Sequence, residues 1–139
     1  VTVHAATVTD RVFDDRWSST PGSTWVVVDA SAAVVHTETA ATIRHAVLVV
    51  GDRSYAASTR SSAFVLNSVA LSIDVPTRGW LAFELPADAL SARGAERARL
   101  ELAMNADPRL DSMIVATIDL TTVPALAEVE LSDAVWGER

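Results

Sequence analysis

The sequence predicts an all-β fold, an antiparallel β-sandwich of about eight or nine short strands in a chain of 139 residues. Apolar and polar residues alternate with a period of two in many short runs, as they do in half-buried strands. Turn-forming residues separate these runs at regular spacing, and no stretch combines a sustained 3.6-residue period with helix caps. We expect one domain over residues 1–139.

The clearest predicted strand is the stretch 79–86, Gly-Trp-Leu-Ala-Phe-Glu-Leu-Pro. One face of this strand is strongly apolar and carries Leu81, Phe83 and Leu85. Trp80 and Glu84 fall on the opposite face, because successive side chains in a strand alternate. Pro86 cannot donate to a sheet and therefore ends the strand. A strand with one apolar face needs a second layer, which the other predicted strands supply.

The first half of the chain contains four further predicted strands, at residues 1–13, 25–35, 43–50 and 53–57. The run 25–35 is the longest β-rich segment and has the composition of an inner sandwich strand. Residues 14–24 are rich in Asp, Ser, Pro and Gly, which are turn formers, and the connection at residues 36–42 is polar and rich in Thr. Gly51 and Asp52 separate two β-rich runs by two residues, and this spacing predicts a hairpin.

The second half predicts four more strands, at residues 69–75, 97–104, 113–120 and 126–131. Residues 97–104 alternate strictly, so one face of that strand should be exposed to solvent. The segment 86–90 is long enough for one helical turn at a corner. Together with the strands before them, these runs favour an antiparallel sandwich over an α/β fold, because no helical segments lie between the strands.

The charge balance argues against a nucleic-acid partner. Eleven basic and eighteen acidic residues give a formal net charge of −7, whereas non-specific nucleic-acid binding needs a positive face.

Cysteine is absent, which excludes disulfides, thiolate zinc sites and cysteine nucleophiles. No apolar run approaches the roughly 18 residues of a membrane span. The chain begins at Val1, so we expect any signal peptide or membrane anchor upstream of it.

The order of these features resembles a known family over roughly residues 23–121. The sharpest parts are the hairpin from Gly51-Asp52 to Tyr55 and the strand from Gly79 to Pro86. They resemble the immunoglobulin-like domains of bacterial exported proteins of unknown function, related to the immunoprotective extracellular antigen of mycobacteria. The resemblance implies an immunoglobulin-like sandwich in an extracytoplasmic location, secreted or membrane-anchored. It transfers no catalytic residues, and the chain departs from the pattern at residues 58–68 and after Pro124.

The sequence does not contain the usual signatures of an enzyme. His4, His36 and His45 are scattered and lack metal-ligand spacing. No Gly-x-Ser-x-Gly motif or phosphate-binding glycine loop occurs. We therefore expect no catalytic residues, no cofactor and a protein that is not an enzyme.

Four aspartates are weak candidates for a calcium site, although the sequence predicts no metal. They are Asp14, Asp15, Asp107 and Asp111. Their loops would have to meet at one end of the sandwich, and no EF-hand pattern is present. The competing interpretation is that these aspartates form turns.

Aromatic residues are the main candidates for a binding surface, and we single out Trp25, Trp80, Trp17 and Tyr55. Trp25 and Trp80 lie opposite the predicted core faces of their own strands. If those strands are neighbours, the two rings form an exposed aromatic patch, suited to a protein or a sugar. In the competing interpretation, the assigned faces are off by one residue or a loop covers the rings.

These observations lead to two hypotheses about function. The first is a non-catalytic interaction module that presents a sheet face or edge to another cell-envelope or secreted protein. The alternative is a module that binds a carbohydrate or another small ligand through the same aromatic residues and nearby carboxylates. Exposed edges such as residues 1–8 or 126–131 could also pair between chains and form a homo-oligomer.

Overall fold

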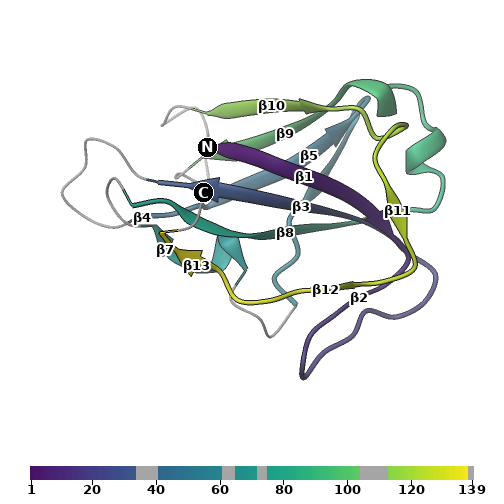
Figure 1. The fold of residues 1–139 in the computed structure, drawn as a ribbon. Helices are drawn as coiled ribbons and strands as arrows, with labels where there is room; N and C mark the ends of the chain where they lie inside the picture. The colour runs from purple at the N-terminus through teal and green to yellow at the C-terminus, as the bar shows by residue number, and fades with distance from the viewer. Residues whose placement is uncertain (34–40, 61–64, 72–74, 104–112, 138–139) are drawn as a thin grey trace.

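The computed structural model describes residues 1–33, 41–60, 65–71, 75–103 and 113–137. This part of the chain is all-β: it contains thirteen strands, and its only helical residues form three short 3-10 turns. Two larger sheets face each other, and two pairs of short strands flank them (Figure 1). The predicted all-β class is confirmed, and the layered arrangement is that of a β-sandwich.

The first sheet is built on three long strands that pair antiparallel. They are β1 (Thr2–Thr9), β3 (Thr24–Ala32) and β8 (Thr77–Leu85). Short strands occupy the two edges, β11 (Ala125–Leu126) beside β1 and β13 (Val135–Trp136) beside β8. Strand β8 is the predicted strand 79–86, beginning two residues earlier than expected.

The second sheet has the strand order β10-β9-β5-β6, and all its pairs are antiparallel. Its strands are β5 (His45–Val50), β6 (Arg53–Ala56), β9 (Ala98–Ala103) and β10 (Ile114–Ile118). The predicted hairpin is confirmed, with Val50 opposite Arg53. Gly51 turns this hairpin at a φ of +63°, and a Cβ there would lie 2.5 Å from the carbonyl oxygen of Arg93. The position therefore needs glycine.

Short elements complete the described chain. Strand β2 (Val12–Phe13) pairs with β12 (Val129–Glu130), and β4 (Ala41–Thr42) pairs with β7 (Ala70–Leu71). The 3-10 turns are η1 (Leu66–Ser68), η2 (Ala89–Ser91) and η3 (Ala95–Arg97). Turn η2 overlaps the predicted corner. Of the predicted strand 69–75 only β7 is seen, because residues 72–74 lie outside the described part.

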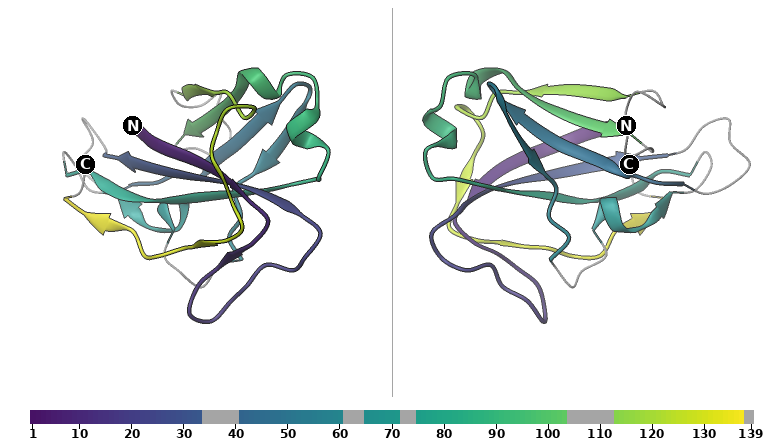
Figure 2. Two further views of the ribbon diagram at one scale, coloured as in Figure 1. Left: turned by 45° about the vertical axis from the view of Figure 1, so that its right-hand side comes forward. Right: turned by 180° about the vertical axis from the view of Figure 1, so that it is seen from behind.

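The C-terminal segment corrects two predictions. Residues 126–131 do not form one strand: residues 124–137, here called the C-terminal strap, contribute the three two-residue strands β11, β12 and β13. Strands β11 and β12 run parallel to β1 and β2, so the sandwich is not purely antiparallel. The reason is the path of the strap, which crosses the outer side of the first sheet from the edge at β1 to the edge at β8 (Figures 1 and 2).

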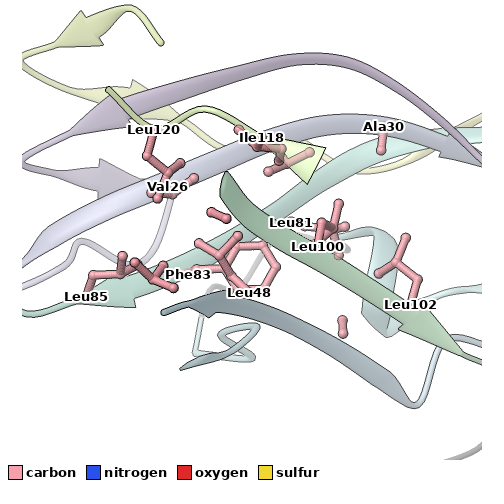
Figure 3. Close-up of a cluster of buried hydrophobic side chains, with 14 of the residues drawn as sticks. Val26, Ala30, Leu48, Leu81, Phe83, Leu85, Leu100, Leu102, Ile118 and Leu120 are labelled. Carbon is pink, nitrogen blue, oxygen red and sulfur yellow. The ribbon is translucent and has the colours of Figure 1, made fainter. Parts of the chain in front are cut away.

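The main core lies between the two sheets. Leu81, Phe83 and Leu85 of β8 all point into it and are fully buried, as their alternation predicts. Figure 3 shows Phe83 meeting Leu48 from the opposite sheet. Burying each such side chain stabilises the fold by roughly 1.5–3 kcal/mol, so these contacts hold the two layers together.

A second, smaller core covers the outer face of the first sheet. Its buried members are Val12, Trp25, Val27, Val65, Ala82 and Leu131. Strand β2 and the C-terminal strap supply Val12 and Leu131, which close over β3 and β8. The first sheet is therefore covered on both faces, which explains why β3 is apolar on both sides.

Candidate functional site

The histidines of the described chain are held by single polar contacts. The Nε2 atom of His4 lies 3.0 Å from the hydroxyl of Ser31, and that of His45 lies 3.3 Å from the Oε1 atom of Glu101. His36 lies outside the described residues. No group of three or more histidines or carboxylates within the described ranges could hold a metal ion.

Asp14 has a structural contact of the kind that the turn interpretation expects. Its Oδ1 atom accepts hydrogen bonds from the backbone N–H groups of Arg16 and Trp17, at 2.8 and 2.9 Å. This carboxylate therefore closes a local turn in the loop before β3. Asp15 lies exposed beside it, whereas Asp107 and Asp111 fall outside the described residues. The calcium hypothesis stays a prediction.

Trp25 presents no surface to a partner, because its exposed fraction is 0%. Trp17 packs edge-on against it with ring centroids 6.0 Å apart, and the guanidinium of Arg60 lies 5.4 Å from the Trp25 ring centroid. Arg60 also pairs with Glu84 at 2.6 Å. The assignment of faces from sequence was right, but a loop covers the ring. Of the two interpretations, covering of Trp25 by a loop is confirmed, and an exposed patch of Trp25 and Trp80 does not form.

Trp80 lies beside a small hollow of about 230 Å³ between the first sheet and the C-terminal strap. Its indole N–H donates to the hydroxyl of Ser132 at 3.2 Å. Across the strand pair, Arg78 holds Asp29 with two hydrogen bonds of 3.0 and 2.7 Å. Asp133 adds a second carboxylate to the lining. The hollow thus combines an aromatic ring with charged and hydroxyl groups that could bind a polar ligand.

Tyr55 serves mainly as a packing residue in this structure. It is partly buried, and its ring packs against the main core from the edge strand β6. It also lines an open hollow together with Arg60 and Glu84. Trp17 and Trp80 both pack against the second core, whereas Tyr55 packs against the main core, so the three residues do not converge on one site.

The sheet edges differ in how they are protected. Natural proteins block exposed edges by keeping them short, by placing charges on them or by covering them. In the first sheet, the two-residue strands β11 and β13 pair only with the ends of β1 and β8, so no described strand pairs with the outer side of β1 from Thr2 to Thr7. Strand β6 carries Arg53, and the chain after it crosses to the first sheet, where the backbone N–H of Ser58 donates to the carbonyl of Ala82 at 2.7 Å.

Among the described residues, strand β10 has none of these protections. It is five residues long, Ile-Val-Ala-Thr-Ile, and has no charged residue or proline. It pairs with β9 on one side, and no described strand pairs with it on the other. Met113, Ile114 and Val115 are consecutive, apolar and exposed. In Figure 1 this strand forms the upper border of the molecule. We call residues 113–118 the β10 edge.

This edge was not predicted from the sequence, where residues 113–120 are one of the predicted strands and residues 1–8 and 126–131 are the examples of exposed edges. The absence of charge from residues 112–118 does not identify this edge, because residues 1–9 and 61–73 also contain no charged residue.

Comparison of the chain with protein-family models, curated proteins and solved structures gave no match. No helix within the described ranges reaches the length and hydropathy required to cross a bilayer.

Proposed function

We propose that this protein is a non-catalytic interaction module that binds another protein chain through the β10 edge. The observation that carries the proposal is an apolar, charge-free strand of five residues at an unblocked sheet edge. Such a strand offers a row of backbone donors and acceptors beside apolar side chains, which is the arrangement used in strand addition. An uncovered strand of this kind would promote aggregation. We therefore propose that another protein chain covers it.

The proposed module is immunoglobulin-like and extracytoplasmic. The pairing orders β1-β3-β8 and β10-β9-β5-β6 support this reading. The letters A, B, C, C′, E, F and G can be given in chain order to β1, β3, β5, β6, β8, β9 and β10. One sheet then has the order A-B-E and the other G-F-C-C′, which is typical of immunoglobulin-like sandwiches. The resemblance to domains of bacterial exported proteins then supports a partner in the cell envelope or among secreted proteins.

The test uses two matched lysine substitutions, Val115→Lys and Val135→Lys. Val115 is 48% exposed on β10 and Val135 is 51% exposed on β13, so both variants should fold. A lysine on an edge strand opposes the docking of a further strand. We expect a partner from an extract of the producing cells to bind immobilised wild type and Val135→Lys but not Val115→Lys. Equal capture by all three proteins would contradict the role of the β10 edge.

A second candidate function is the binding of a sugar or another small polar ligand in the hollow beside Trp80. The observation that favours it is the Trp80 ring placed near the Asp29–Arg78 pair and Asp133. Saturable thermal stabilisation by a sugar, lost in Trp80→Ala and kept in Val115→Lys, would support this function. A screen in which no sugar raises the melting temperature would count against it.

A further inference from the structure

We infer that the chain docking at the β10 edge is a second copy of this protein, with the two β10 strands antiparallel about a two-fold axis at Ala116. This inference rests on the proposed function, since it names the partner of the same edge. In the resulting assembly the two four-stranded sheets would join into one continuous sheet of eight strands.

The sequence of β10 is nearly symmetric about its centre. A two-fold axis at Ala116 places Ile114 opposite the second copy's Ile118, and Val115 opposite the second copy's Thr117. Each of these pairs joins two β-branched residues, which are favourable cross-strand neighbours. Alanine, the smallest residue of the strand, meets itself at the axis. This register pairs every residue of β10.

The same register preserves the layering of both copies. Directly opposite residues in an antiparallel pair point to the same face of the sheet. Ala116 and Ile118 pack on the main core, and the exposed Ile114 lies on the same face by strand alternation, so these three residues share one face with their counterparts in the second copy. The exposed side chains of Ile114 and Val115 would gain apolar neighbours, so self-pairing would cover the side chains that are bare in the single chain.

Charge does not oppose this register, although each copy carries a net charge of −7. On the neighbouring strand β9, Glu101 stands opposite Val115, and Arg99 stands opposite Thr117. In the proposed register, Glu101 and Val115 lie in line across the joined sheet with the second copy's Thr117 and Arg99. Each such line of four residues contains one acid and one base, and like charges do not meet directly, which favours association.

The test uses the absence of cysteine in the chain. In an antiparallel pair, directly opposite Cα atoms lie about 4.5–5.5 Å apart, within the range of about 4.4–6.8 Å that a disulfide spans. Ala116→Cys should therefore form a disulfide-linked dimer on mild oxidation and return to monomer on reduction. Val115→Cys and Thr117→Cys alone should not, because each would meet itself only diagonally, at about 7–8 Å.

A mixture of Val115→Cys and Thr117→Cys provides a second arm at two exposed positions. Their opposite placement in the proposed register predicts a mixed dimer, identified by its mass. This arm also decides the question if Ala116→Cys fails to fold. A disulfide dimer of Val115→Cys with itself, or no dimer in either arm, would overturn the inference.

The outcome for the second copy can be separated from that for the edge. Suppose that neither cysteine experiment gives a cross-linked dimer, and that wild type captures a protein other than itself which Val115→Lys does not capture. The second copy is then excluded and the proposed function stands. If Val115→Lys also behaves as wild type in capture, both are contradicted. Sedimentation of wild type and Val115→Lys adds a reading without cross-linking, with a dimer expected for wild type only.

Discussion

Trp25 shows how far single residues could be assigned from the sequence. Its alternation with Val26 and Val28 placed it on the outer face of β3, and the structure agrees. The cover could not be predicted, because it comes from Trp17, eight residues earlier, and Arg60, thirty-five residues later. The indole N–H of Trp25 has no acceptor among the described residues. The contribution of Trp25 is therefore packing.

This burial predicts the effect of truncating Trp25. We expect Trp25→Ala to lower the free energy of unfolding by about 3–5 kcal/mol, because it leaves a cavity in the second core. The matched control is Trp136→Ala, at a tryptophan that is 63% exposed, where we expect a change within about 0.5 kcal/mol. Urea denaturation of both variants measures the difference. Similar stability of the two variants would show that Trp25 is not a core residue.

At the scale of elements, the long strands were predictable and the short ones were not. Strands β8 and β9 alternate over nine and six residues, so their pattern identifies both the strand and its inward face, and β3 is recognised as a nine-residue run rich in β-branched residues. The strap consists of two-residue strands, whose partners at β1, β2 and β8 are set by the tertiary fold. No local periodicity can reveal such pairings.

Gly79 illustrates the same limit within a well-predicted strand. The sequence suggests that it marks the entry to the strand, but it lies inside β8 in extended backbone. A Cβ at this position would lie 2.9 Å from the Cβ of Ala134 in the strap and 3.3 Å from that of Leu66 in η1. Glycine here permits a close approach of two segments. Only the tertiary structure reveals that function of the residue.

At the scale of the whole molecule, the opposed apolar faces of the predicted strands imply two layers, and the structure has them (Figure 3). The candidate site was harder to predict, because an edge is defined by a neighbour that is absent. Ile114, Ala116 and Ile118 follow the period of an ordinary inner strand, and their sequence does not show that β10 ends the sheet. The sequence instead indicated aromatic residues as the candidate binding surface. In the fold these residues pack against the two cores, and Trp80 also lies beside a small hollow.

The central claim is that the β10 edge is an unprotected strand which a second copy covers. Amide hydrogen exchange, measured by NMR along β10 at increasing protein concentration, tests it most directly, because exchange reports whether each N–H is hydrogen-bonded. In a single copy, alternate amides point toward β9 and away from it, so slow and fast exchange should alternate from Ile114 to Ile118. The account predicts that the fast amides become slow as concentration rises. An alternating pattern that persists at every concentration would contradict it.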